Sequence, residues 1–405
     1  MAQKELIITK GKDQYLFSNK KKYLDFSLSS GAMILGHANK IYLKAINKAH
    51  TKGSNFSSNN VNKIEFEKNL RIAFPEMEEF IFSNSGSEAT TRALRIARAI
   101  TNKKKYAIVN GSWHGSVNEF MYDLRKVKKK TKTISLSSGI EPYNKDVVVL
   151  PCNDLKKSLQ ILDKNYKKIS MLIVEPIQCS VPNIKMIGYL RFLHDYCKKK
   201  KIIICFDEII TGLRVQKLSI FKKYKLKPDM VTFSKCLGGG LPIGITCTNK
   251  STSKKIKKLN KNIFFGGTFS GNPLSTKVGN DTLVYYKKNQ SFFNNKINGY
   301  ASYLEKEINE YCYKNRINFR LMRYESIIRA TFTAQEITNK MNREIYDQNF
   351  QKSINFKKFL QLKYIFISSN CCFFISTCHN EKNLNYLIKV IKEFLRYEYT
   401  ENQKV

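Results

Sequence analysis

Two stretches of the 405-residue chain decide its fold: FDEIITG at residues 206–212 and FSKCLGGGLP at residues 233–242. Each stretch closes a short apolar run, over residues 201–206 and 229–234 respectively, and then turns toward polar residues or glycine. A short apolar run bounded by turn residues is typical of a buried β-strand. The two stretches therefore predict two strands that each end in a chemically active side chain.

An acid and an amine stand at these two strand ends. The carboxylate of Asp207 would pair with a basic ring nitrogen and keep it protonated, and the amine of Lys235 would hold an aldehyde as a Schiff base. Pyridoxal 5'-phosphate carries both groups. Such residues beside glycines also occur in α/β proteins that bind no cofactor, so the remainder of the chain must decide between the two interpretations.

Length and composition indicate a globular protein of two or three domains, with 42% hydrophobic and 12% aromatic residues. No run of about 18 apolar residues is present, so we expect no membrane span. The first residues, MAQKE, lack the apolar core of a signal peptide, which favours a cytoplasmic protein. The ten cysteines show no CxxC spacing, so reduced thiols are expected and no metal site.

The formal net charge of +39 would ordinarily suggest a nucleic-acid partner. The lysines, however, are spread along the whole chain, and no nucleic-acid-binding motif accompanies them. We therefore expect no specific nucleic-acid function, and only weak adhesion to polyanions.

Apolar runs alternate with helical patterns between residues 60 and 285, which predicts a mostly parallel sheet with helices on both faces. The expected strands span residues 79–83, 106–109, 147–150, 171–174, 202–206, 230–233 and 243–246. Three units follow: an N-terminal segment (1–50) that packs with a small domain, a large cofactor-binding domain (51–285) and a small C-terminal α+β domain (286–405). Ligands of such sheets bind at the carboxyl ends of the strands.

Further motifs fall at strand ends. NSGSEA at residues 84–89 lies between a strand and a helix, where free amides and the helix dipole would bind an anion, although a serine cap without ligand is the alternative. GSWHG at 111–115 holds the only tryptophan, whose flat ring could stack on a cofactor or fill a core. EPIQ at 175–178 and GGTFSGNPL at 266–274 complete the set.

Taken together and in this order, these blocks resemble the class III, fold-type I pyridoxal-phosphate aminotransferases, especially the glutamate-1-semialdehyde 2,1-aminomutase-like branch. The resemblance implies the aspartate aminotransferase-like α/β fold, with a mostly parallel seven-stranded sheet in the large domain and a smaller α+β domain. It implies that Lys235 forms the Schiff base and then moves a proton. It also implies that Asp207 pairs with the pyridinium nitrogen.

The resemblance also assigns the cofactor-binding positions. Gly86 and Ser87, with Ser85 nearby, would hold the phosphate, and Thr268 would reach the phosphate of a neighbouring subunit. The site would then be shared across a homodimer interface. The remaining positions contact the ring or its surroundings: Trp113 and His114 in the turn, Ile209 on the other face, Gln178 near the 3-oxygen, and Glu88 at the substrate entrance.

Two departures from the family pattern bear on the substrate. Trp113 stands where the family usually has tyrosine, and residues 367–374 lack the Arg or Glu that the family often has there. We therefore expect an aminotransferase that acts on a small-molecule amine and a carbonyl acceptor other than glutamate 1-semialdehyde. An intramolecular aminomutase is the alternative, and an inactive relative with the same fold is a second alternative.

Overall fold

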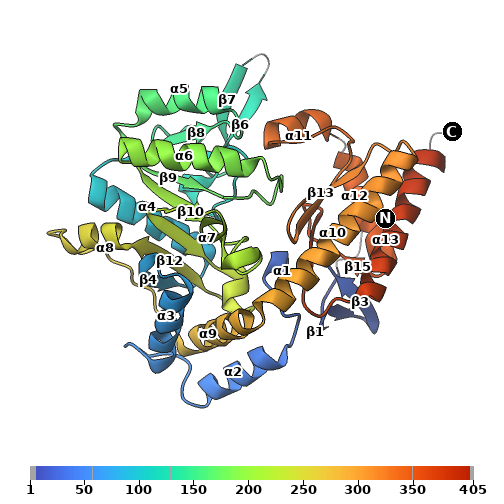
Figure 1. The fold of residues 1–405 in the computed structure, drawn as a ribbon, viewed down its shortest axis with the longest axis horizontal. Coiled ribbons are helices and arrows are strands. Elements are labelled where there is room, and N and C mark those ends of the chain that lie inside the picture. Colours follow the sequence, from blue (N-terminus) through green and yellow to red (C-terminus); the bar gives the residue numbers. More distant parts are fainter. Residues whose placement is uncertain (1–5, 57, 128–129, 349, 402–405) are drawn as a thin grey trace.

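The computed structural model describes residues 6–56, 58–127, 130–348 and 350–401. A seven-stranded sheet forms its largest element (Figure 1). In spatial order its strands are β4 (Met77–Ser83), β12 (Gly244–Asn249), β11 (Met230–Phe233), β10 (Ile203–Asp207), β9 (Ile169–Val174), β5 (Lys105–Val109) and β8 (Val147–Leu150). β12 runs antiparallel to both neighbours, and the other pairs are parallel. The prediction of a mostly parallel seven-stranded sheet is confirmed.

Alternate residues of the central strands pack into two different hydrophobic cores, one on each face of the sheet. In β9, Leu172 and Val174 belong to one core, whereas Met171 and Ile173 belong to the other. Because successive strand residues point to opposite faces, both faces of the sheet are buried. This is why the strands read as continuous apolar runs in the sequence.

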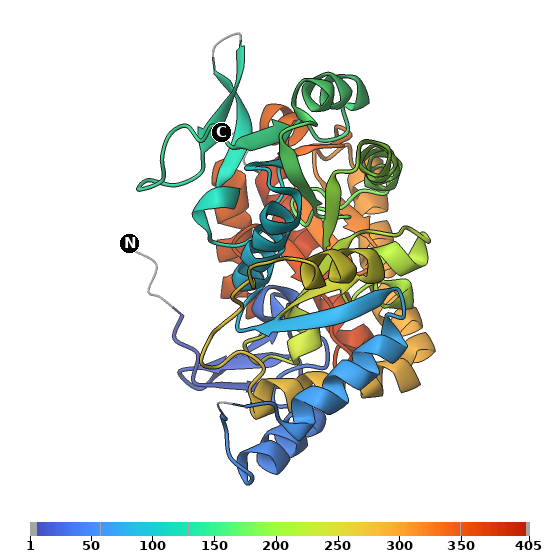
Figure 2. The ribbon, with the colours of Figure 1, turned by 90° about the vertical axis from the view of Figure 1, so that its left-hand side faces the viewer.

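Helices cover both faces of this sheet, as Figures 1 and 2 show. Helix α4 contacts β12, β11 and β9, whereas α6 contacts β10 and α5 contacts β8. The helices of this part are α3 (Val61–Ala73), α4 (Gly86–Thr101), α5 (Leu155–Asn165), α6 (Met186–Lys200), α7 (Ile220–Lys223), α8 (Lys250–Lys257) and α9 (Pro273–Lys288). None of the described helices combines the length and the apolar character needed to cross a membrane.

The N-terminal strands join a sheet with a strand from far along the chain. β1 (Lys10–Lys12), β2 (Tyr15–Ser18) and β3 (Lys21–Asp25) are antiparallel, and β15 (Ile365–Phe366) adds in parallel to β3. Asn19 and Lys20 have φ of 47° and 64°, as a tight two-residue hairpin turn requires. The chain continues through α1 (Leu28–Gly31) and α2 (Lys40–His50).

The C-terminal part contains a three-stranded antiparallel sheet that is covered by long helices (Figure 1). Its strands are β13 (Arg320–Tyr324), β14 (Ile327–Thr331) and β16 (Cys372–Phe374), and its helices are α10 (Gln290–Lys314), α11 (Lys340–Tyr346), α12 (Phe350–Leu362) and α13 (Glu381–Arg396). Strand β13 and the hairpin of β6 (Tyr122–Val127) and β7 (Lys130–Ser135) were not predicted. Their charged and polar residues give no apolar run to detect.

One buried arginine, Arg214, connects the N-terminal segment, the large sheet and the C-terminal part. The Arg214 guanidinium donates through Nη2 to the Gly31 carbonyl at 2.6 Å and through Nη1 to the Ile375 carbonyl at 3.2 Å. The guanidinium also lies over the Phe374 ring, 5.0 Å from its centroid. A single side chain thereby connects the turn after β10 with both the N-terminal and the C-terminal segments.

Candidate functional site

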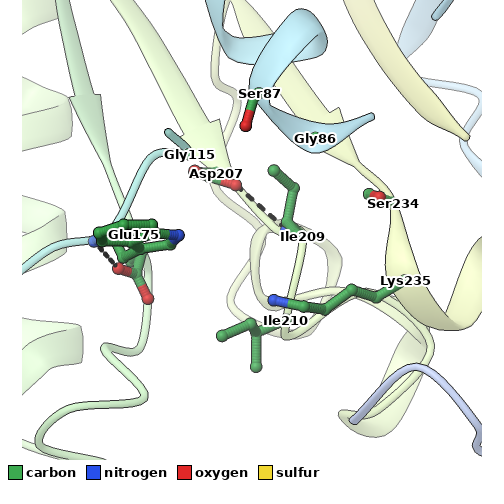
Figure 3. A pocket seen from close by; sticks show the side chains of 10 residues that line it. Gly86, Ser87, Gly115, Glu175, Asp207, Ile209, Ile210, Ser234 and Lys235 are labelled. Carbon is green, nitrogen blue, oxygen red and sulfur yellow. Dashed lines mark hydrogen bonds between the residues drawn. The ribbon is translucent and has the colours of Figure 1, made fainter. Parts of the chain in front are cut away.

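A cavity of about 160 Å³ opens at the carboxyl ends of β9, β10 and β11 (Figure 3). The residues that line it come from five separate parts of the sequence: Gly86, Ser87, Trp113, Gly115, Glu175, Asp207, Ile209, Ile210, Ser234 and Lys235. The structure therefore brings Asp207 and Lys235, the two residues on which the sequence interpretation depends, into one cavity. Within the described ranges, no group of three or more His, Cys, Asp or Glu side chains could hold a metal ion.

Asp207 is held firmly at the end of β10. Its Oδ2 lies 2.7 Å from His114 Nδ1, and its Oδ1 accepts from the Thr232 hydroxyl at 3.1 Å and from the Ile209 N–H at 3.2 Å. Both Asp207 and His114 are almost fully buried. A buried carboxylate with every oxygen bonded keeps one orientation, as a charge that faces a ligand must.

The neighbouring carboxyl group, Glu208, has a different role. Its Oε2 accepts from the Thr211 hydroxyl at 2.6 Å and the Ile220 N–H at 2.9 Å, and its Oε1 accepts from the Phe221 N–H at 2.9 Å. Glu208 therefore caps the first turn of α7 inside the protein. Of the two adjacent acids, only Asp207 lines the cavity.

Lys235 enters the cavity from the turn that follows β11. It begins a 3₁₀ turn, Lys235–Gly238, with φ of 45°, an uncommon value for a residue with a side chain. Figure 3 shows its side chain extending into the cavity beside Ile210, with Ser87 on the far side of Ile209. Backbone strain of this kind is characteristic of functional sites, where the surroundings hold a side chain in one position.

The N-terminus of α4 forms another wall. Gly86 and Ser87 are its first two residues, whose N–H groups have no partner within the helix, and Ser85 is the cap, accepting the Glu88 N–H at 3.1 Å. The backbone packs closely here, because a Cβ on Gly86 would collide with Ile209 and one on Gly115 with Ser87. Free amides at the positive end of a helix dipole bind anions such as phosphate.

Glu175 is a lining residue that the prediction did not include. It follows β9 directly, its Oε1 accepts the Trp113 N–H, and its Oε2 accepts the Cys179 N–H at 3.4 Å. Burial, together with the negative charge of Asp207, raises the pKa of Glu175 to about 7. Its position after an apolar run was a usable signal. The other additional lining residues, Gly115, Ile210 and Ser234, lie inside the motifs 111–115, 206–212 and 233–242, but they were given no role in the prediction.

Several predicted residues lie outside the cavity lining. Gln178 is buried and donates through Nε2 to the Asn110 carbonyl at 2.9 Å and the Ser112 hydroxyl at 3.0 Å, which fixes the turn that leads to Trp113. His114 lies behind Asp207. The Ser85 hydroxyl caps α4 by accepting the Glu88 N–H.

The two remaining predicted residues lie at the surface. Glu88 accepts the Asn84 N–H at 3.2 Å, and its Oε2 lies 3.6 Å from Arg92 Nη2. Both contacts stabilise the start of α4. Thr268 is exposed on the loop before α9, and its carbonyl accepts from Asn55 at 3.1 Å. Neither side chain faces the cavity of its own chain.

The residues present fit pyridoxal phosphate. The cavity offers an amine at Lys235, a carboxylate at Asp207 and an anion site at the start of α4, and each complements a different group of that cofactor. Ile209 supplies an apolar face, and Trp113, which is 53% exposed, stands at the cavity mouth with its ring free to stack.

Comparison with known proteins agrees with this geometry. The family model Aminotransferase class-III matches residues 1–390. A glutamate-1-semialdehyde 2,1-aminomutase from Thermodesulfovibrio yellowstonii is 30% identical over 385 residues, covering 94% of this chain and 88% of that protein.

Solved structures show the same fold. An omega-transaminase from Sphaerobacter thermophilus matches with a TM-score of 0.88 at 19% identity, over 98% of this chain and 92% of that chain. A glutamate-1-semialdehyde aminomutase from Pseudomonas aeruginosa, in complex with PMP, matches with a TM-score of 0.85 at 17% identity, over 96% and 87% of the two chains. The predicted aspartate aminotransferase-like fold is confirmed, and the chain belongs to the class III aminotransferases, a family of pyridoxal-phosphate enzymes.

Proposed function

We propose that this chain is a pyridoxal-phosphate-dependent aminotransferase that moves an amino group from a small amine donor to a carbonyl acceptor. The observation that carries the proposal is the meeting of Lys235, Asp207 and the start of α4 in one cavity. Pyridoxal phosphate, when bound, supplies an aldehyde that condenses with amines and a protonated ring that accepts electrons. The residues of the chain supply binding, orientation and proton transfer.

Lys235 is the residue that holds the cofactor and moves the proton. Its Nζ lies inside the cavity, where a bound amine substrate would present its Cα hydrogen. A positioned amine can take a proton from carbon and return it at another atom. Amino-group transfer requires this shift, since the hydrogen leaves the donor carbon before the new carbonyl forms.

Asp207 keeps a negative charge where the ring nitrogen would lie. His114 and Thr232 orient the carboxylate, so its charge is already in place before the cofactor binds. Gly86 and Ser87 would bind the phosphate, with Ser85 beside them, whereas Ile209 and Trp113 would enclose the two faces of the ring. Gln178 and His114 would act indirectly. Gln178 holds the turn that carries Trp113, and His114 holds the Asp207 carboxylate.

The complete enzyme would be a cytoplasmic homodimer. Thr268 is exposed and away from the cavity of its own chain, so its hydroxyl is free to reach the cavity of a second copy. We also propose that residues 51–285 act as the cofactor-binding domain. Residues 286–405, together with the N-terminal segment 1–50, would form the smaller domain against it.

An aminomutase is the second candidate, because the relative with 30% identity bears the name glutamate-1-semialdehyde 2,1-aminomutase. Such an enzyme transfers the amino group within one molecule. Segment 367–374 argues against glutamate 1-semialdehyde as the substrate, because it lacks the Arg or Glu that the family resemblance leads us to expect there. The two candidates share every cavity residue and differ only in whether a keto product leaves between the half-reactions.

Single-turnover analysis separates the candidates. Cofactor-loaded protein would be mixed with each member of a panel of amines and amino acids, without acceptor, and the visible cofactor band would be followed with product analysis. An aminotransferase bleaches the band and releases one carbonyl product per site. Conversion of glutamate 1-semialdehyde without a released keto product would establish the aminomutase. No response to any amine of the panel or to glutamate 1-semialdehyde would contradict both.

A further inference from the structure

Two cysteines from distant parts of the chain meet beside the cofactor cavity. Cys179 lies in the connection after β9 and Cys372 begins β16, and their sulfur atoms are 3.4 Å apart. Both side chains are buried. The two sulfurs are therefore already in van der Waals contact across the junction of the seven-stranded sheet and the C-terminal sheet.

The surroundings make the two thiols unequal. The Cys179 thiol donates to Cys372, and the Arg329 guanidinium on the paired position of β14 lies 3.8 Å from Cys372 Sγ. That hydrogen bond, aided by the positive charge of Arg329, lowers the pKa of Cys372 to about 7. The same hydrogen bond and burial raise the pKa of Cys179. Burial raises the pKa of the adjacent Cys371 to about 11, so Cys372 is the one of these two neighbouring thiols that forms a thiolate more readily.

A second cavity lies close to this pair of cysteines. It has a volume of about 550 Å³ and is lined by Arg329, Arg343 and Cys371, among other residues of the C-terminal part. Arg329 lies between this cavity and Cys372, because it lines the first and contacts the second. Cys372 itself is buried and does not line this cavity, so an oxidant in the cavity would reach its sulfur past the Arg329 side chain, without entering the cofactor cavity.

We propose that Cys372 and Cys179 are a modification site, a dithiol that a peroxide converts to a disulfide. The Cys372 thiolate attacks one oxygen of hydrogen peroxide, the O–O bond breaks, and hydroxide leaves, which gives a sulfenic acid. The Cys179 thiol then attacks that sulfur, the S–O bond breaks, and water leaves as the disulfide forms. Two thiols and one peroxide become one disulfide and two waters, so the sulfurs are oxidised as the peroxide is reduced.

The bond would affect the cofactor cavity through Glu175. A disulfide has a sulfur separation of about 2.05 Å, so the two residues must approach each other. Cys179 donates its N–H to Glu175, which lines the cavity and also holds the Trp113 N–H. Oxidation would thus link β16 to the loop that carries Cys179 and would displace Glu175, which lines the cavity. Pairs of this kind in a reducing compartment act as sensors.

Peptide mapping of oxidised protein tests the proposal. The full-length protein would be treated with hydrogen peroxide, its remaining thiols would be blocked in denaturant, and it would be digested with trypsin without reduction. We expect a cross-link between the peptides of residues 169–185 and 364–382. Free thiols should fall from ten to eight, the ten cysteines minus two, and dithiothreitol should restore them.

Variants assign the bond, since the second peptide contains Cys371, Cys372 and Cys378. The double variant Cys371→Ser, Cys378→Ser leaves Cys372 in place and should keep the cross-link. In Cys179→Ser, dimedone should label Cys372 as a sulfenic acid. A wild-type digest without the cross-link would overturn the proposal, as would a cross-link that survives Cys372→Ser. Because the readout is mass, either result leaves the proposal of a cofactor site intact.

Discussion

Buried charge is stabilised differently in two parts of this molecule. At the carboxyl edge of the seven-stranded sheet, both oxygens of the Asp207 carboxylate have hydrogen-bond partners. In the C-terminal sheet, among the described residues, Arg329 Nε is buried without a partner, and its guanidinium contacts a sulfur instead. The first region is a prearranged site with fixed charges, whereas the second leaves a cation free to activate a thiol.

Removing the charge of Asp207 should have the largest effect. Asp207→Asn keeps the shape and the acceptor for Thr232, but it loses the negative charge that faces the cavity. We expect turnover of the loaded enzyme to fall about 10³-fold, the size of effect seen when one electrostatic contact is removed from an active site. Steady-state kinetics with the best donor of the amine panel would measure it.

The matched control is Asp195→Asn. Asp195 also lies 2.8 Å from a histidine Nδ1, that of His194, but its side chain is 78% exposed and does not line the cavity. This variant should keep wild-type turnover. A loss of less than tenfold in Asp207→Asn would contradict the prearranged charge.

Arg214→Met tests the connection between the two regions. The substitution leaves the buried carbonyl of Ile375 without its side-chain donor, and it removes the guanidinium from the Gly31 carbonyl, which keeps only the Cys236 thiol at 3.0 Å. An unsatisfied buried carbonyl costs about 1 to 3 kcal/mol and a lost hydrogen bond to a charged group about 1.5 to 3 kcal/mol, so we expect a loss of about 4 kcal/mol in the free energy of unfolding. Urea denaturation would measure it.

Arg191→Met is the corresponding surface change. Its guanidinium also lies over an aromatic ring, that of Tyr224, but at an exposed position. It should cost less than about 1 kcal/mol. Equal losses in the two variants would show that Arg214 does not join the segments.

Glu175 should make stability depend on pH. Its pKa is raised from 4.5 in the unfolded chain to about 7 in the folded protein, so folding favours the protonated acid. The folded state is then destabilised as pH rises from about 4.5 to about 7, by up to about 3 kcal/mol at 1.36 kcal/mol per unit. In Glu175→Gln, this decline should become shallower.

The decline should not disappear in Glu175→Gln, because burial also raises the pKa of Glu208 to about 7. Urea denaturation of both proteins between pH 4.5 and 8 would show the difference. An identical pH slope in wild type and Glu175→Gln would mean that Glu175 is ionised in the fold.

Thr268→Val gives the smallest expected effect and tests the dimer. If Thr268 serves the cavity of a second copy, loss of its hydroxyl should weaken cofactor binding about tenfold, or about 1.4 kcal/mol, through one lost phosphate contact. Thr268→Ser should restore it. Unchanged cofactor affinity in a protein that sediments as a monomer would refute the shared site.

The difference between the two regions also explains what the sequence could predict. Asp207 and Lys235 follow apolar runs at strand ends, so their meeting in one cavity follows from the parallel sheet alone. Neither the pairing of β15 with β3 nor the contact of Cys179 with Cys372 has such a local signal. Both join segments more than a hundred residues apart, and packing of short strands decides them. Gln178 shows what a motif cannot predict. Its motif indicated a strand end, but it did not indicate that the side chain would point to Asn110 and Ser112.

The central claim is that Lys235 holds the cofactor in this cavity. The direct measurement is reduction of pyridoxal-phosphate-loaded protein with borohydride, followed by peptide mass mapping, with Lys277, a nearly buried lysine on α9, as the internal control. We predict loss of the visible band and the added cofactor mass on Lys235, with none on Lys277. A protein that stays colourless with added cofactor and gains no mass on Lys235 would contradict the claim, leaving an inactive relative with the aminotransferase fold.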